Sequence, residues 1–266
     1  MKKRLFWSLT VILSIVFIYS GSQVYRALDV YGSEENTHSA LLGMKPAMGE
    51  TPADGADKSG MGVANDADKP GMGVANGGAD NGWIAGIKAI NPDTVGWITI
   101  PGTKVDYPIV MSRDNEEYLH TDIYGNKSPS GSIFVDCACD GDFGGFNTII
   151  YGHHMNNGSM FGTIKYFRDK TFFDANRTGT VTLPDRAFTL YIFAFLSVEP
   201  GDPVIYDTIS ADGEGVSEYI AYVKARAERF RDVDLSASDH IVTLSTCTNG
   251  PGDKRMALLA KLCAFD

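Results

Sequence analysis

Cys247 and Arg255, two residue types that take part in acyl transfer, lie on either side of a predicted turn between two strands. Cys247 ends the segment 241–247 (IVTLSTC), whose side-chain alternation predicts a strand. A turn-forming sequence, TNGPGDK at 248–254, follows it, and Arg255 then opens an apolar stretch. If the two strands pair as a hairpin, about 4.8 Å apart, Arg255 lies close to Cys247.

This pair of residues would suit attack on a peptide carbonyl. The thiolate is the nucleophilic form of cysteine, and an ordinary thiol with a pKa of about 8.5 is mostly protonated at neutral pH. A positive neighbour raises the thiolate fraction. The Arg255 guanidinium also stays charged at any working pH, so its donors could stabilise the oxyanion that forms on attack.

A third candidate, His153, ends another predicted strand, 147–153 (NTIIYGH). Acyl transfer needs a group that protonates the leaving amine and later takes a proton from the incoming one, which is a common role of histidine. Its neighbour His154 would point elsewhere from an extended chain. From the residues alone, Cys247 and His153 could also be loop residues that never meet.

The elements that must position these residues lie in the region 83–266, which we predict to be one folded domain. Its short strands are separated by turns and show no regular β-α alternation, which predicts an antiparallel β-barrel or sandwich, here interpreted as a barrel, with peripheral helices. The predicted helices are 83–90, 160–167 with Ser159 as N-cap, and 216–230. The predicted strands are 95–100, 107–111, 131–135, 148–151, 180–183, 188–198, 241–246 and 256–263.

The N-terminal residues 1–26 are predicted to be a cytoplasmic stub and a transmembrane anchor. Three basic residues at 2–4 precede an uncharged stretch at 5–25, which as a helix would span about 30 Å, the thickness of a hydrocarbon core. The basic flank predicts a cytoplasmic N-terminus, and so a single-pass cell-membrane protein with its catalytic domain on the extracellular face. A cleaved signal peptide is the alternative, but no clear cleavage site follows the stretch.

Residues 27–82 are predicted to be a flexible linker. From about residue 43 the composition is dominated by Gly, Ala, Asp and Asn, and the unit ADKSGMGVAND at 56–66 recurs at 67–77 as ADKPGMGVANG. Two copies are too few for a solenoid, so a tether is the simpler interpretation.

The charge of the whole chain bears on its partners. A net charge of -10 without a basic stripe argues against a nucleic-acid partner.

Three sequence features together closely resemble the signatures of the sortase family: TLSTC at 243–247, NTIIYGHHM at 147–155 and the arginine at 255. The TLSTC and YGHHM forms resemble class B. The resemblance covers 83–266, including DTVGWITIPGTKVDYPIV at 93–110. It implies an eight-stranded sortase β-barrel, an N-terminal anchor and no metal or organic cofactor.

The same resemblance implies a cysteine transpeptidase. Cys247 would attack a C-terminal sorting signal of a secreted protein and form a thioester. His153 would act as acid and then as base, and Arg255 would hold the oxyanion or the signal's backbone. An amine of a peptidoglycan precursor would then resolve the thioester.

The resemblance also implies a set of substrate-binding residues. Asn115 and Leu119 fall where class B enzymes line the signal groove, and Ser245 would contribute a hydroxyl. Ile205 and Tyr206 are further candidates. The alternative is that Leu119 and Ile205 belong to the core and that Asn115 caps a helix.

Other residues near these motifs have open roles. Asn249 stands where some class B members carry an acidic residue, so no acidic triad is expected; it could orient His153 or simply form the turn. Disulfides are not required in a domain of this size. Cys137 and Cys139 are predicted to be loop thiols without a catalytic role, and Cys263 to be a buried apolar thiol.

Three alternative functions remain at this stage. A cysteine endopeptidase or hydrolase would release the acyl group to water instead of an amine. A non-catalytic, membrane-tethered binding module for cell-wall peptides would keep Cys247 buried. A zinc protein would use Cys137, Cys139, His153 and His154, although adjacent histidines lack the spacing of a helical ligand pair.

Overall fold

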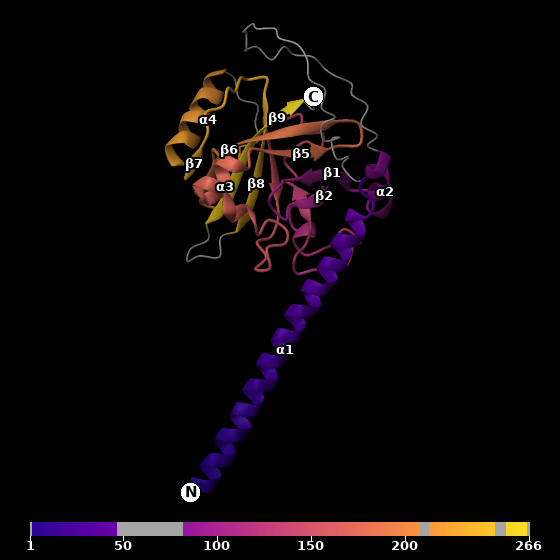
Figure 1. Cartoon of the computed structure of the whole chain (residues 1–266), viewed down its shortest axis with the longest axis vertical. Helices are drawn as coiled ribbons and strands as arrows, with labels where there is room; N and C mark the ends of the chain where they lie inside the picture. The colour runs from indigo at the N-terminus through magenta and orange to yellow at the C-terminus, as the bar shows by residue number, and fades with distance from the viewer. Residues whose placement is uncertain (1, 47–81, 208–212, 248–253, 265–266) are drawn as a thin grey trace, which may run out of the picture.

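The computed structural model describes residues 2–46, 82–207, 213–247 and 254–264. Helix α1 (Lys2–Leu42) runs away from a β-domain and contacts it only near its C-terminal end (Figure 1). The outer part of α1 leaves apolar side chains such as Ile12 and Phe17 exposed. Among the residues that the structure describes, no helix has the length and the unbroken apolar character that a membrane crossing requires.

Eight strands close into a barrel. Their neighbour order is β5-β1-β2-β3-β4-β8-β9-β6, and β6 pairs again with β5 to close the ring. The predicted eight-stranded β-barrel is therefore confirmed, and each predicted strand segment overlaps one barrel strand. These strands are β1 (Thr94–Thr99), β2 (Asp106–Val110), β3 (Ile133–Val135), β4 (Asn147–Tyr151), β5 (Thr178–Thr182), β6 (Ala187–Val198), β8 (His240–Cys247) and β9 (Arg255–Ala264).

The barrel contains parallel as well as antiparallel pairs, so the prediction of an antiparallel barrel was wrong in this respect. Strands β2 and β3 pair in parallel, and so do β4 and β8. A parallel pair needs a long crossover between its strands. The β4–β8 crossover contains two other barrel strands and helix α4 (Gly213–Arg226). Because of this pairing, β4 and β8 both end at the same end of the barrel.

The observed helices agree only in part with those predicted from the sequence. Helix α2 (Gly82–Ile90) forms as predicted, but α4 ends at Arg226 because β7 (Arg229–Phe230) pairs with β6. A short helix α3 (Lys170–Ala175) was not predicted.

The predicted helix 160–167 with Ser159 as N-cap was wrong. Met160 has a left-handed backbone with φ of 51°, and its N–H donates to the Tyr107 hydroxyl at 3.1 Å. That conformation is rare for a residue other than glycine and cannot continue an α-helix. A short 3₁₀ helix, η2 (Ile164–Arg168), follows instead.

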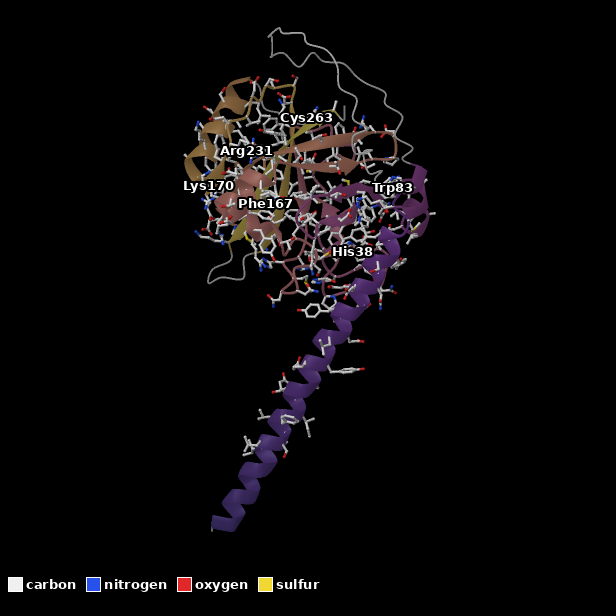
Figure 2. The ribbon with its side chains drawn as sticks, viewed as in Figure 1. His38, Trp83, Phe167, Lys170, Arg231 and Cys263 are labelled. Carbon is white, nitrogen blue, oxygen red and sulfur yellow. The ribbon has the colours of Figure 1, made fainter. Side chains whose placement is uncertain are left out.

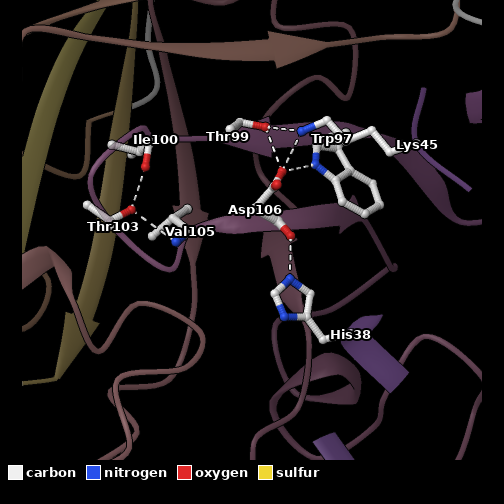
Figure 3. A network of polar contacts seen from close by, with 8 residues as sticks. All are labelled: His38, Lys45, Trp97, Thr99, Ile100, Thr103, Val105 and Asp106. Atoms are coloured by element: carbon white, nitrogen blue, oxygen red, sulfur yellow. Dashed lines mark hydrogen bonds and ion pairs between the residues drawn. The ribbon is translucent and has the colours of Figure 1, made fainter. Parts of the chain in front are cut away.

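The C-terminal part of α1 docks on the barrel at β2. The His38 ring stacks on Tyr107 with 4.3 Å between the ring centroids, and its Nε2 lies 2.8 Å from the Asp106 carbonyl oxygen. Lys45, just after the helix, places its Nζ 2.6 Å from Asp106 Oδ1 (Figure 3). Figure 2 shows His38 at the point where α1 meets the domain. The segment assigned to the linker thus begins as docked helix, and residues 47–81 lie outside the described residues.

Candidate active site at the ends of β4 and β8

The parallel pairing of β4 and β8 brings the positions of His153 and Cys247 together. Tyr151 pairs with Ser245 in this ladder, and the Gly152 N–H donates to the Ser245 carbonyl at 3.2 Å. His153 and Cys247 each follow these partners by two residues, at the same end of the barrel. The Cys247 side chain lies outside the described residues, so its backbone alone marks the position.

Arg255 lies opposite Cys247 in the next ladder. Strands β8 and β9 form the predicted hairpin, and their antiparallel register pairs Cys247 directly with Arg255. Residues directly opposite each other in such a ladder point to the same face of the sheet. The turn at 248–253, including Asn249, lies outside the described residues.

A cavity of about 300 Å³ opens at this end of the barrel, and both His153 and Arg255 line it. Two positions far apart in the sequence therefore face one cavity next to the end of β8. The other described residues that line it are Asn115, Glu116, Leu119, Phe134, Tyr151, Gly152, Pro200, Gly201, Tyr206, Ser245 and Thr246.

A backbone carbonyl orients the His153 ring. Its Nε2 lies 2.8 Å from the carbonyl oxygen of Leu119. Because a carbonyl oxygen only accepts hydrogen bonds, Nε2 carries the proton in the neutral ring. In that form Nδ1 carries no proton. The backbone of His153 is held as well, since its carbonyl accepts from the Phe161 N–H at 2.9 Å.

Asn115 and Leu119 both line the cavity. The Asn115 Oδ1 accepts from the Cys137 N–H at 2.9 Å, which ties this wall to the neighbouring loop. Asn115 is not a helix cap; instead Asp114 Oδ1 accepts from the N–H groups of Glu116 and Glu117, at the start of η1 (Glu117–Leu119). The Leu119 side chain is partly buried against neighbouring core residues.

Ser245 and Tyr206 form one wall together. Their hydroxyl oxygens are 2.8 Å apart, and the Tyr206 ring stacks on Tyr151 with centroids 6.4 Å apart.

Ile205 differs from the adjacent Tyr206 in the position of its side chain. Its side chain is fully buried in the core under α4 and does not line the cavity, which contradicts a direct substrate contact. It belongs to the core, as the alternative interpretation had it.

The sequence analysis missed Tyr151 as a cavity residue. Its hydroxyl donates to Asp136 Oδ2 at 2.8 Å. Burial, together with this carboxylate, raises the pKa of Tyr151 well above its usual value, so the hydroxyl stays protonated. The position of Tyr151 inside the string YGHHM was the available signal.

The other cysteines are poor candidates for the nucleophile. Burial raises the pKa of the Cys139 thiol to about 11, and a thiol in that state is mostly unreactive at neutral pH. Cys137 is exposed but does not line the cavity. Cys263 is only partly buried, so the prediction of a buried thiol was wrong. In the described part of the chain, no three His, Cys, Asp or Glu side chains gather as metal ligands would.

Comparisons with known proteins agree on one family. The sortase domain family matches residues 98–263. Sortase B of Listeria monocytogenes is 31% identical over 257 residues, which cover 96% of this chain and 95% of that protein. Sortase B of Staphylococcus aureus is 28% identical over 178 residues, or 66% of this chain and 72% of that protein.

Solved structures give the same result. The Staphylococcus aureus sortase B–substrate complex superposes with a TM-score of 0.65 at 26% identity, covering 70% of this chain and 87% of that one. Sortase B of Clostridium perfringens superposes with a TM-score of 0.63 at 34% identity, covering 67% of this chain and 98% of that one.

Proposed function

Because this chain belongs to the sortase family, and within it to class B, whose members are cysteine transpeptidases, we propose which bonds it breaks and makes. It cleaves a C-terminal sorting signal of secreted proteins and transfers the acyl group to an amine of cell-wall peptidoglycan. The observation that carries this proposal is the cavity that His153 and Arg255 share beside the end of β8. The Staphylococcus aureus relative has been solved as a sortase B–substrate complex, which supports a substrate for this chain as well.

In the first half of the reaction, the Cys247 thiolate attacks the signal's scissile carbonyl carbon. Arg255 donates hydrogen bonds to the oxyanion that develops on the carbonyl oxygen. As the C–N bond breaks, protonated His153 gives the proton on Nδ1 to the departing amine. The products of this half are a thioester on Cys247 and a neutral His153.

In the second half, a neutral amine attacks the thioester carbonyl. His153 takes one proton from this amine as the new C–N bond forms, and the C–S bond breaks to return the Cys247 thiolate. The imidazolium and the thiolate are then both restored. No metal or organic cofactor enters these steps.

The walls of the cavity would hold the sorting signal. We assign its side chains to the surface formed by Asn115, Leu119, Tyr206 and Ser245, which all line the cavity. The hydrogen bonds that already fix Asn115 and Ser245 support this assignment, because a wall that is rigid before binding costs less to order. A role of Asn249 in orienting His153 stays a prediction from the sequence.

The location of the enzyme rests on the sequence. We propose that residues 1–26 anchor the chain in the cell membrane, that 27–82 connect the anchor to the barrel, and that 83–266 act on the extracellular face. The uncharged stretch 5–25 behind three basic residues supports the anchor. Fractionation with carbonate extraction tests it: an anchored chain stays in the membrane pellet.

Product analysis by mass spectrometry tests the reaction. The full chain is incubated with sorting-signal peptides and candidate amines, beside the variants Cys247→Ala and His153→Ala. We expect a peptide–amine conjugate and an acyl adduct on Cys247 in the wild type, and neither in Cys247→Ala. Hydrolysis alone at every amine concentration would favour the endopeptidase alternative, and peptide binding without any reaction would favour the binding module.

Thiol labelling gives an independent check on the nucleophile. We expect a methanethiosulfonate reagent to modify Cys247 at neutral pH and to block the reaction. Cys139 is the internal control, because its raised pKa of about 11 keeps it protonated. If Cys247 resists the reagent as well as Cys139 does, the nucleophile has been assigned to the wrong residue.

A further inference from the structure

Two side chains of opposite charge line the cavity, the Arg255 guanidinium and the Glu116 carboxylate. Arg255 is the first residue of β9, and the exposed Lys254 before it lies 3.5 Å from a carboxylate oxygen of Glu199. Glu116 directly precedes η1, and the nearby Asp114 and Glu117 are exposed but do not line the cavity. Among the described residues that line the cavity, Glu116 is the one carboxylate.

Hydrogen bonds hold the backbone on both sides of Glu116. Asp114 Oδ1 accepts from the Glu116 N–H at 2.9 Å and from the Glu117 N–H at 3.0 Å, and the Ser112 hydroxyl donates to the Asp114 carbonyl at 2.6 Å. The neighbouring Asn115 is fixed from the other side by the Cys137 N–H. The backbone of Glu116 is therefore fixed, while its side chain is exposed to the solvent that enters the cavity.

The second substrate of the proposed reaction has the matching charge. A primary alkyl amine has a pKa of about 10.4, so it arrives as an ammonium ion at neutral pH. A carboxylate beside a cavity with protein walls concentrates cations there, whereas a guanidinium repels them. In the proposed reaction Arg255 is engaged by the carbonyl oxygen of the sorting signal, which leaves Glu116 as the charged lining residue that can attract the amine.

We propose that Glu116 binds the ammonium form of the incoming amine and directs it to the thioester. This inference rests on the proposed transpeptidase function. The ammonium ion loses one proton to solvent as it leaves Glu116. The neutral amine then gives its second proton to His153 as the C–N bond forms and the C–S bond breaks.

The inference explains how transfer would compete with hydrolysis. Water carries no charge, so a carboxylate does not raise its local concentration. Glu116 therefore raises the rate of amine attack on the thioester without raising the rate of water attack. It acts after the thioester has formed and leaves thioester formation unchanged.

The test compares two neighbouring glutamates in the full chain. Glu116→Gln removes the carboxylate from the cavity, and Glu117→Gln makes the same change on an exposed residue that does not line it. Two quantities are measured for each variant: the rate of thioester formation with a sorting-signal peptide, and the ratio of transfer to hydrolysis as a function of the concentration of a glycine-based or diaminopimelate-based amine.

We expect Glu116→Gln to raise the amine concentration for half-maximal transfer about five-fold at low ionic strength, since one partly screened charge pair is lost. Thioester formation stays at the wild-type rate. Glu117→Gln behaves as the wild type, and Glu116→Asp, which keeps the charge, recovers most of the effect. Added salt reduces the difference between Glu116→Gln and the wild type.

Two results would overturn the inference while the proposed function stands. One is equal behaviour of Glu116→Gln and Glu117→Gln. The other is a parallel loss of thioester formation and transfer in Glu116→Gln, which indicates a structural role. If the wild-type chain forms no thioester with any signal peptide, the proposed function itself fails and the Glu116 assignment fails with it.

Discussion

Charged side chains have different surroundings in two regions of this molecule, the contact between α1 and the barrel and the cavity at the candidate active site. In the docking cluster, formed by His38, Lys45, Trp97, Thr99 and Asp106, one carboxylate oxygen of Asp106 accepts from Lys45 Nζ, Trp97 Nε1 and Thr99 Oγ1, at 2.6, 2.6 and 2.7 Å (Figure 3). The protein itself satisfies the charge there. At the candidate active site, the charged residues Arg255 and Glu116 instead line a cavity of about 300 Å³.

The difference has an energetic meaning. A buried donor or acceptor that loses its partner costs far more than an exposed one, so the docking cluster adds to stability only while it is complete. Arg255 and Glu116 instead line a cavity, and in the proposed reaction they would act on a substrate or a transition state there. Substitutions in the two regions should therefore affect different measurements.

The largest effect is expected at Arg255. Arg255→Lys keeps the positive charge but removes the planar fork of donors, so the oxyanion loses part of its stabilisation. We expect the single-turnover rate of thioester formation to fall about 10²- to 10³-fold. The free energy of unfolding should change by less than about 1 kcal/mol, because the side chain is only partly buried. A rate within tenfold of the wild type would remove Arg255 from the oxyanion site.

In the docking cluster, Asp106→Ala should lower stability without affecting chemistry. It leaves the indole N–H of Trp97, a residue only 1% exposed, and the Lys45 ammonium without this acceptor. We expect the free energy of unfolding to fall by about 2–4 kcal/mol in urea denaturation. The activity of each folded molecule should stay at the wild-type level.

Asp232→Ala is the matched control for this experiment. Asp232 also accepts from a lysine, with Lys224 Nζ 2.8 Å from its Oδ1, but its side chain is 89% exposed. We expect a loss below about 1 kcal/mol, as for other exposed ion pairs. Equal losses in the two variants would mean that burial does not distinguish the docking cluster from the surface.

The candidate active site and the docking cluster also differ in how far the sequence predicts them. Strand-like runs separated by turn residues located all eight barrel strands, and the TNGPGDK turn placed Arg255 close to Cys247, because both signals are local. The parallel pairing of β4 with β8 is not local, so the residues alone left open whether His153 and Cys247 meet. The resemblance to sortases supplied that step.

What the sequence analysis missed depends mostly on contacts that leave no side-chain pattern. The carbonyl of Leu119 orients His153, and a backbone group has no sequence signature. The sequence shows Asp106 only as the first residue of a strand, and its contact with Lys45 after α1 depends on tertiary packing. The false helix at 160–167 arose because a tertiary hydrogen bond to Tyr107 holds Met160 in a conformation that its own propensity disfavours.

The smallest expected effect concerns Tyr206. Like the docking cluster it has a hydrogen-bond partner inside the protein, and like the candidate site it lines the cavity. Its hydroxyl lies 2.8 Å from that of Ser245, a residue 1% exposed, and its ring lines the cavity. Tyr206→Phe removes the neutral hydrogen bond with Ser245, so we expect about 1 kcal/mol less stability and a rise of less than tenfold in the KM for the sorting signal, with kcat unchanged.

Tyr166→Phe provides the comparison, since this tyrosine is 45% exposed and lies away from the cavity lining. It should change neither stability nor kinetics measurably. A hundredfold fall of kcat in Tyr206→Phe would contradict the wall assignment, because a hydroxyl that only shapes the groove contributes equally to the bound substrate and to the transition state. In that case the hydroxyl of Tyr206 would belong with His153 and Arg255 among the groups that touch the reacting atoms.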